Sequence, residues 1–452
     1  MSAAVIDGMP DSANSENSMR RDRSIRLAVA TSLVSKFGTV LLQLLSIPLA
    51  VRILGREEFG LYTMVNLTLG TVSLLEIGVG PALAHGLSKA RATGDADGEK
   101  SLASTAFLVM AVMALLVGGL MATVLFFVPP GGLFGDKFID KGHILRPALW
   151  TGLGLFLLLF VVNLTERIRE GYLEVAANNL WGAVGNVMGA VFVVAGIWFI
   201  PEVWFLVLAV HGAMILAKAG NMLSVWKKHP LTVPSFAAFR PSLVRPLLTD
   251  GLSFSACFIL TSFVEANFCG WMIGRIGGGP SSVALWGVFV TLTVMQLGFV
   301  VMLSTPTWPA VAEALARGDF KWARSAARRL YLFGIGFAAL SALGLVLLGP
   351  WGMGVWLGKA FAGTDRAVLA CYAVYFILHV WRHLNHAMMI GTGQVKRLAA
   401  IQIFETVVMI AAVWASLHFG SLRIMLLAMA ATITGITGWI LPRLVHRALS
   451  RS

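Results

Sequence analysis

Long apolar runs separated by short polar segments dominate the chain. Each run has about 18 to 28 residues, the length of a helix that crosses a hydrocarbon layer of ~30 Å. The sequence therefore predicts an all-α integral membrane protein with about twelve transmembrane helices. We expect these helices at residues 27–52, 60–86, 101–128, 147–165, 178–200, 202–223, 247–274, 281–308, 328–349, 366–391, 397–418 and 421–442.

The amino-acid composition supports this interpretation. Of the 452 residues, 57% are hydrophobic and only 13% are charged. A water-soluble domain of this size has no core large enough to hide so much apolar surface. The composition excludes a soluble globular protein, and lipid must solvate much of the surface.

One segment of the first half returns in shortened form in the second half. Residues 81–95 read PALAHGLSKARATGD, and residues 309–319 read PAVAEALARGD. The leading prolines are 228 residues apart (309 minus 81), and the closing glycines are 224 apart (318 minus 94). A weaker echo pairs residues 169–174 with residues 389–394, at an offset of 220.

Such internal repeats of hydrophobic units are typical of transporters, whose substrate path lies between the two halves. We therefore expect two six-helix lobes of MATE-like, two-lobe architecture. The predicted division is a polar N-terminal tail at 1–24, a first lobe at 25–223, a linker at 224–246, a second lobe at 247–442 and a basic C-terminal tail at 443–452.

The formal net charge of +13 has a simple topological interpretation. Lys and Arg are concentrated in the loops expected on the same side as both termini, and such loops are usually cytoplasmic. We expect both termini in the cytoplasm, with the remaining excess charge attracting anionic membrane lipids. A nucleic-acid partner is not expected.

The first predicted helix carries a polar stripe. Its members recur at spacings of four and three, which places them on one helical face. Lys36 and Gln43 are candidate cavity-lining residues, and Lys36 is a candidate ligand for a phosphate group. A structural ion pair or a side chain that reaches the membrane surface is the alternative for Lys36. The stripe comprises Ser32, Lys36, Thr39, Gln43 and Ser46.

The tenth predicted helix, at 366–391, is the most polar. Arginine and histidine at membrane depth are costly, so they indicate a cavity or an inter-helix hydrogen-bond network. His379, Arg382 and His386 are the candidate binding residues. His379 and His383 lack a companion carboxylate or cysteine motif, so no metal is expected. The polar face comprises Tyr372, Tyr375, His379, Arg382 and His386.

Four acidic residues lie inside the predicted spans. Each is a candidate for carrying a coupling proton or for neutralising Lys36, Arg382 or Lys218. A mixed-charge cluster at 166–174, in contrast, is expected to be a solvated helix end or a salt-bridge gate. The four acidic residues are Glu76, Asp250, Glu265 and Glu405, and Glu76 could instead fix helix packing.

Two strings carry a resemblance to a known family. Residues 46–62 read SIPLAVRILGREEFGLY, and residues 76–83 read EIGVGPAL. They resemble the opening of polysaccharide-biosynthesis flippases of the O-antigen and exopolysaccharide type (Wzx-type). These flippases belong to the same multidrug/oligosaccharidyl-lipid/polysaccharide exporter superfamily as the MATE drug exporters.

The resemblance implies two lobes that form a V and work by alternating access. The implied substrate is an undecaprenyl-diphosphate-linked oligosaccharide, moved from the cytoplasmic to the periplasmic leaflet of a bacterial inner membrane. Polysaccharide polymerase or export machinery would be a partner. No cofactor is expected, and a proton gradient, a sodium gradient or the membrane potential would drive transport. Arg52, near the outer end of its helix, would receive the headgroup or anchor the helix at the interface.

Two alternatives remain. A MATE-like, cation-coupled drug exporter shares the architecture but needs an acidic, aromatic pocket, whereas Lys36 and Arg382 favour an anionic guest. A membrane glycan polymerase or ligase would need a large external loop or a paired acidic motif, and the 129–146 loop offers only Asp136 and Asp140 among its acids. The chain also lacks a Walker A motif. We therefore expect a transporter and not an enzyme.

Overall fold

The structure, a computed structural model, describes residues 11–73, 79–249 and 263–450. Within these ranges the regular elements are helices. The long helices and their bounds are α1 (Asp11–Ser73), α2 (Val79–Thr93), α3 (Ala96–Phe127), α5 (Gly142–Val162), α7 (Val175–Gly196), α8 (Val203–Lys228), α11 (Pro280–Ala316), α12 (Phe320–Leu357), α13 (Arg366–Gly391), α14 (Val395–Phe419), α15 (Leu422–Gly435) and α16 (Thr437–Ser450).

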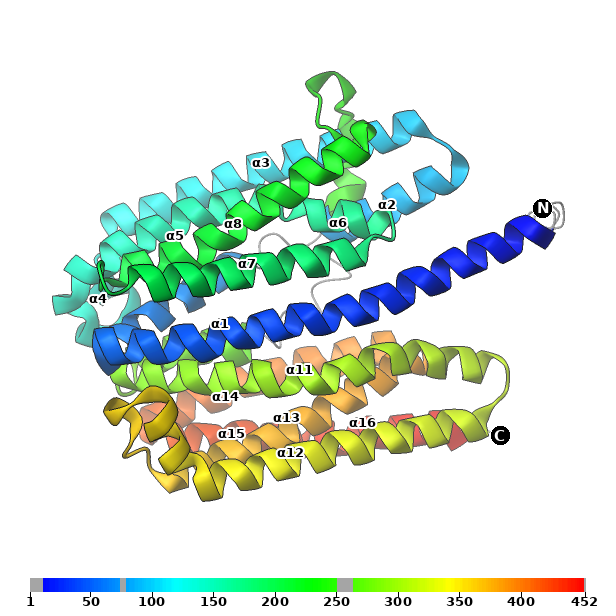
Figure 1. Cartoon of the computed structure of the whole chain (residues 1–452). Coiled ribbons are helices and arrows are strands. Elements are labelled where there is room, and N and C mark those ends of the chain that lie inside the picture. Colours follow the sequence, from blue (N-terminus) through cyan, green and yellow to red (C-terminus); the bar gives the residue numbers. More distant parts are fainter. Residues whose placement is uncertain (1–10, 74–78, 250–262, 451–452) are drawn as a thin grey trace.

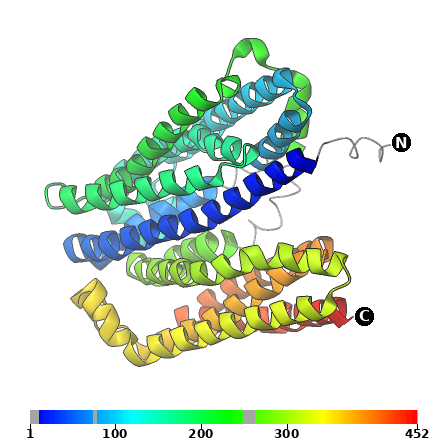
Figure 2. The same ribbon diagram turned by 45° about the vertical axis from the view of Figure 1, so that its right-hand side comes forward.

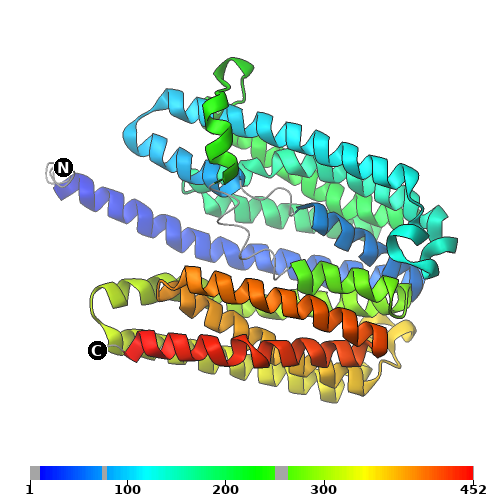
Figure 3. The same ribbon diagram turned by 180° about the vertical axis from the view of Figure 1, so that it is seen from behind.

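The helices form two lobes (Figure 1). Elements α1 to α8 make the first lobe and elements α10 to α16 make the second, with α1 and α11 side by side at the seam. The views in Figures 2 and 3 show the same division, and both termini lie at one end of the molecule. We call this the terminal end. Short elements complete the lobes: α4 (Pro130–Phe134), α6 (Leu164–Gly171) and α10 (Cys269–Arg275).

Ten described helical segments are long and apolar enough to cross a membrane. The expected spans at 60–86 and 247–274 contain residues 74–78 and 250–262, which lie outside the described ranges. The prediction of an all-helical, multi-pass membrane protein is confirmed.

The first two expected helices meet directly. Residues 27–52 and 60–86 were expected as separate helices, and the element α1 (Asp11–Ser73) consists of two helices joined at Gly55, the first of which passes Pro48. The only non-helical backbone in α1 is at Gly55, with φ of 85° and ψ of 170°. A positive φ at this position is readily adopted by glycine and strains other residues. The expected loop is therefore reduced to a sharp kink between the two helices, and the first of them begins within the expected N-terminal tail.

The two copies of the first repeated segment end in the same kind of turn. Gly94 has φ of 70° and Gly318 has φ of 78°. The amide N–H of Asp95 donates to Ala90 O at 2.9 Å, and that of Asp319 donates to Ala314 O at 2.8 Å. Each aspartate also accepts a hydrogen bond at the start of the next helix, from Gly98 N or Trp322 N. Aspartate is a preferred residue at the N-cap of a helix. The chain therefore reverses direction in both copies through the same glycine turn and aspartate cap.

The second echo also has a matching backbone. Leu173 and Gly393, which are 220 residues apart, both have positive φ, at 59° and 72°. The preceding glycines allow close helix crossings. A Cβ on Gly171 would lie 3.0 Å from Ala84 O, and one on Gly391 would lie 2.8 Å from Trp308 O. Leu173 adopts a conformation that is costly for a bulky residue, which shows that the surrounding lobe fixes this turn.

Hydrogen bonds join the lobes at the end opposite the termini. Arg56 Nε donates to Ser281 O at 3.2 Å, and its Nη1 donates to Ala360 O at 3.3 Å. Lys137 Nζ donates to Gly277 O at 2.7 Å, and Arg275 Nη1 donates to Gly132 O at 3.0 Å. These contacts use charged donors and backbone acceptors, so they close this end without needing a matched acid in the partner lobe.

Candidate functional site

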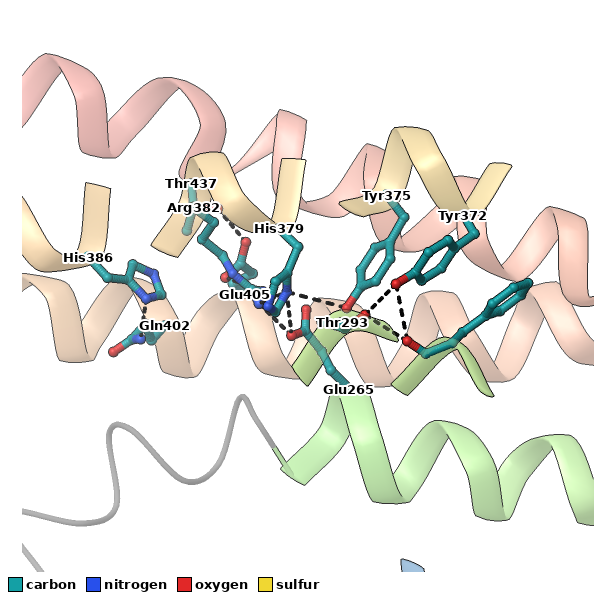
Figure 4. Close-up of polar contacts among 11 residues, drawn as sticks. Glu265, Thr293, Tyr372, Tyr375, His379, Arg382, His386, Gln402, Glu405 and Thr437 are labelled. Carbon is teal, nitrogen blue, oxygen red and sulfur yellow. Dashed lines mark hydrogen bonds and ion pairs between the residues drawn. The ribbon is translucent and has the colours of Figure 1, made fainter. Parts of the chain in front are cut away.

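The polar residues of α13 lie in a row inside the second lobe (Figure 4). The row runs from Tyr372 past Arg382 to His386, between α11, α14 and the turn that carries Glu265. The helical spacing in the sequence predicted this shared face. The structure confirms that the members lie together, while their roles remain a proposal.

Arg382 is the centre of the row and is 4% exposed. Its Nη2 donates to Glu265 Oε2 at 2.5 Å, and its Nη1 donates to Glu405 Oε2 at 3.5 Å. Thr437 of α16 donates its hydroxyl to the other oxygen of Glu405 at 2.5 Å. Two buried carboxylates thus pair with Arg382, while its predicted role as a binding residue stays a prediction. Both Glu265 and Glu405 are the charge partners that the sequence suggested for it.

The cluster holds one more acid than base. Two carboxylates and one guanidinium carry a net charge of −1 when all three are ionised, and a proton on either carboxylate removes it. His379 Nδ1 lies 3.1 Å from Glu265 Oε2 and 3.1 Å from Arg382 Nη2. A guanidinium can only donate, so Nδ1 accepts from Arg382 when it carries no hydrogen and donates to Glu265 when it carries one, in the neutral Nδ1–H tautomer or in the protonated ring. The hydrogen on Nδ1 thus decides which of the two His379 binds.

Glu265 reaches Arg382 from an irregular turn. Residues Val264–Phe268 form the π-helical turn η6, which directly precedes α10. A π-helical turn contains an extra residue and changes the direction of the side chains around it. Glu265 Oε1 is buried and has no hydrogen-bond partner within the described part of the chain. The turn therefore aims one carboxylate oxygen at Arg382 and leaves the other without a partner.

Two cavities lie against this cluster, and His379 borders both. One has a volume of about 210 Å³ and is bordered also by Arg382, His383, His386 and Gln402. The other has a volume of about 170 Å³ and is bordered by Glu265, Thr293, Tyr372 and Tyr375. His386 Nε2 and Gln402 Oε1 lack partners among the described residues, although His386 Nδ1 lies 3.1 Å from Gln402 Nε2. Cavities with polar atoms to satisfy are suited to water or to hydroxyl groups.

Tyr372 supports the row from one end. Its hydroxyl donates to Phe289 O at 3.1 Å and lies 2.8 Å from Thr293 Oγ1. Its ring stacks on Phe289 with 4.3 Å between centroids. These contacts fix α13 against α11, so Tyr372 holds the wall of the smaller cavity in place.

The first-lobe candidates lie apart from this cluster. Lys36 is exposed on α1 beside Gly298 of α11, where a Cβ would lie 4.0 Å from Lys36 Nζ. No ion pair involves Lys36 in the described part of the chain. Gln43 Oε1 is buried and has no hydrogen-bond partner in the described part of the chain. Thr39 instead accepts a hydrogen bond of 2.9 Å from Asn186 of α7, so the predicted stripe does not face one cavity throughout.

Arg52 lies at the closed end. Its Nη2 donates to Val355 O at 2.7 Å and to Trp356 O at 3.4 Å, and so joins the first lobe to the second. The other two predicted acids, Glu76 and Asp250, lie outside the described residues.

The mixed-charge cluster at 166–174, expected to be a solvated helix end or a salt-bridge gate, forms a network of ion pairs around one buried arginine. Arg169 is 3% exposed and donates to Asn221, Glu174 and Ser224 at 2.6, 2.6 and 2.9 Å. Lys218 forms an ion pair of 2.8 Å with Glu166. The amides inside the predicted spans, including Asn221, were the signal that could have revealed this network.

Glu174 is the acidic residue of this network that lies outside the candidate membrane-spanning helices. Partial burial raises its pKa, but hydrogen bonds and charge from Lys228 and His229 outweigh burial and hold the pKa below its ordinary value. Lys228 Nζ lies 2.5 Å and His229 Nε2 lies 3.0 Å from Glu174 Oε1. The carboxylate is thus stabilised in its charged form.

Comparisons with solved structures place this fold. The chain is similar to an inward-facing multidrug-resistance MATE family transporter of the MOP superfamily, with a TM-score of 0.73, 16% identity and coverage of 94% of this chain and 99% of the other. An outward-facing MATE family transporter gives a TM-score of 0.65 at 15% identity, and the match covers 96% of this chain and 97% of the other. A MOP superfamily transporter from Pyrococcus furiosus gives a TM-score of 0.65 at 14% identity, and that match covers 94% of this chain and 96% of the other.

Sequence comparison identifies the family. No curated protein matches the chain in sequence. The profile of one family, described as "Polysaccharide biosynthesis protein", matches residues 28–315, which is more than half of the chain. This match includes the two strings on which the resemblance rested. The chain therefore belongs to the polysaccharide biosynthesis protein family, and it has the MATE-like fold of MOP superfamily transporters.

Proposed function

We propose that the chain is a flippase for an undecaprenyl-diphosphate-linked oligosaccharide in surface polysaccharide biosynthesis. The observation that carries the proposal is the charged row on α13, buried inside a lobe whose outer surface suits lipid. Ionisable groups at membrane depth mark substrate or ion paths. The family supplies the class of cargo, and the fold supplies the mode of transport by two lobes.

In this proposal the diphosphate and the coupling ion use different residues. Lys36 lies at the α1–α11 seam without an acidic partner in the described part of the chain, so its ammonium is available to a phosphate. Arg382 is neutralised and instead organises Glu265 and His379. These two groups are the proposed proton carriers, because a proton between them changes the hydrogen bonds around Arg382.

The proposed state is open toward the cytoplasm. The lobes are joined at the end opposite the termini by Arg52, Arg56 and Lys137. The higher TM-score with an inward-facing relative than with an outward-facing one supports this state. Because Lys and Arg favour the loops on the terminal side, we assign that side to the cytoplasm of a bacterial inner membrane. Release on the far side would deliver cargo to a polymerase.

A cation-coupled drug exporter is the second candidate function. The excess carboxylate beside Tyr372 and Tyr375 is the observation that favours it, because an acidic, aromatic site suits a cationic guest. The two cavities, of about 210 and 170 Å³, are small for a drug, since ligand pockets usually have about 300–1,000 Å³. They fit an ion and water better than a drug.

The test is a deletion of the gene in its native host, followed by mass spectrometry of lipid-linked oligosaccharides. We expect one undecaprenyl-diphosphate glycan to accumulate and the corresponding surface polymer to be lost. Re-expression of Lys36→Ala should fail to restore export at normal membrane abundance, while Lys36→Arg should restore it in part. Unchanged lipid intermediates, together with new sensitivity to cationic drugs, would favour the exporter.

A further inference from the structure

The internal repeat reveals a difference in charge at matching positions. In the α11 copy, Glu313 and Arg317 lie one helical turn apart and form an ion pair. In the α2 copy, His85 takes the place of the glutamate and Lys89 takes the place of the arginine, as the repeat aligns them. Lys89 therefore lacks the acidic neighbour that neutralises its counterpart.

The α2 copy also borders a large cavity at the terminal end. Its volume is about 800 Å³, within the usual range for a small-molecule site. Its walls come from α2, the start of α3 and the linker, and we call it the α2 vestibule. The charged and titratable groups on its wall are His85, Lys89, Asp95 and Arg240. Asp95 accepts the Gly98 N–H at 2.8 Å and keeps its negative charge, so two cations and one carboxylate leave the wall with a formal charge of +1.

Hydrogen bonds hold the linker in place opposite α2. Ser235 N donates to Ser104 Oγ at 3.1 Å, and Arg240 N donates to Thr105 Oγ1 at 3.1 Å. Both hydroxyl residues are buried, at 3% and 0% exposed. Figure 3 shows the linker segment at residues 241–249 descending beside α2. The backbone of Arg240 is thus fixed, and the residue borders the same cavity as Lys89.

Apart from Thr93, the remaining wall is apolar. Leu102, Leu243, Pro246 and Leu247 border the same cavity. A cavity with cations and an apolar wall suits an amphiphile that joins a phosphate group to a hydrocarbon chain. Inorganic phosphate would use only the polar part, and a neutral lipid would use only the apolar part.

We propose that the α2 vestibule captures the diphosphate headgroup of a polyprenyl lipid through Lys89 and Arg240, before the headgroup reaches the seam at Lys36. This inference rests on the proposed function and adds a binding site to it. In the second copy the matching arginine, Arg317, is already paired with Glu313, so we assign capture to the first lobe.

The test is binding of polyprenyl diphosphate to the purified full-length chain in nanodiscs, measured by native mass spectrometry. We expect the double variant Lys89→Gln and Arg240→Gln to weaken binding by about tenfold or more, since charge-assisted contacts to phosphate are lost. The matched control is Arg317→Gln, which should leave binding unchanged. Polyprenol without phosphate and inorganic diphosphate should both bind much more weakly than the intact lipid.

Three results would overturn the inference. These are unchanged binding in the double variant, an equal loss in Arg317→Gln, or equal binding of phosphatidylglycerol. The proposed function would survive each of them if the deletion strain still accumulated its lipid-linked glycan. Absence of that accumulation would instead contradict the proposed function itself, whatever the binding result.

Discussion

The two lobes repeat a backbone but place their charges differently. At the offset of 220, Asn163 and Glu166 of the first lobe match His383 and His386 of the second. In the first lobe, Lys218 joins this pair through Glu166 Oε1 at 2.8 Å and Asn163 Oδ1 at 2.5 Å. In the second lobe, the matching polar residues border a cavity instead.

The balance of charge also differs. The first-lobe network pairs each internal cation with an acid, as in Arg169 with Glu174. The second-lobe cluster surrounds Arg382 with two carboxylates and lies against two cavities. Balanced pairs stabilise a conformation, whereas an excess charge beside a cavity can change with the binding of a cation. The comparison therefore assigns a supporting role to the first-lobe network and a coupling role to the second.

The largest expected effect follows removal of the central cation. Arg382→Met should destabilise the protein by about 3–5 kcal/mol, because it leaves two buried carboxylates unpaired. The matched variant Arg169→Met should have a smaller effect, since Glu174 keeps Lys228 and His229 as partners. Thermal unfolding in detergent and membrane abundance measure both. Equal losses in the two variants would show that the lobes do not differ in this respect.

The sequence predicted the helices and the row on α13 for a simple reason. Apolar length identifies a membrane helix, and spacing along one helix places Tyr375, His379 and Arg382 on one face. Both patterns are local, so they can be read without knowing which helices are neighbours.

The partners of that row required the tertiary structure. Glu265 and Glu405 lie 117 and 23 residues from Arg382 in the sequence. A π-helical turn rotates Glu265 toward it, and no helical spacing predicts such a turn. The burial of Arg169 could not be predicted for a related reason. Its mixed-charge surroundings are typical of a solvated helix end, and its hydrogen bond to Asn221 exists only because α6 packs against α8.

Substitutions of the two carboxylates in the cluster should have different effects, one mainly on transport and the other mainly on stability. Glu265 borders a cavity, and its second oxygen has no partner in the described part of the chain, whereas Glu405 is 0% exposed and also accepts from Thr437. Glu265→Gln should lower transport by about tenfold, as expected for the loss of a coupling free energy of about 1–3 kcal/mol. Glu405→Gln should chiefly lower the melting temperature.

Lipid-linked glycan export and melting temperature, measured on the same preparations, distinguish these effects. A melting temperature that falls as much in Glu265→Gln as in Glu405→Gln would contradict the division of roles. It would reduce the cluster to a structural ion network like that of the first lobe.

A smaller effect is expected at the first-lobe network as the pH falls. The pKa of Glu174 is held below its ordinary value of 4.5, so its ionised form stabilises the folded protein at pH values above 4.5. This stabilisation should be lost as the pH falls from 4.5 through the lower folded-state pKa. Glu174→Gln should be less stable at neutral pH and should show a weaker loss over this acidic window. Melting curves in detergent at several pH values would test this, and parallel curves for both proteins would refute it.

The smallest effect should follow a substitution at the contact between the lobes. Such a change affects how the two lobes are positioned relative to each other and leaves the interior of each lobe intact. Arg52 donates to Val355 O and Trp356 O, which are backbone acceptors at a partly exposed site. Arg52→Gln should weaken the closed end by about 1 kcal/mol, the usual net contribution of such hydrogen bonds. That loss would increase the population of the state open at this end by about fivefold. Spin labels placed across this contact would report the change as a longer distance. Because neither lobe's internal network touches Arg52, the melting temperature should hardly move, and a large drop would mean that this residue supports the fold of a lobe and not the contact between lobes.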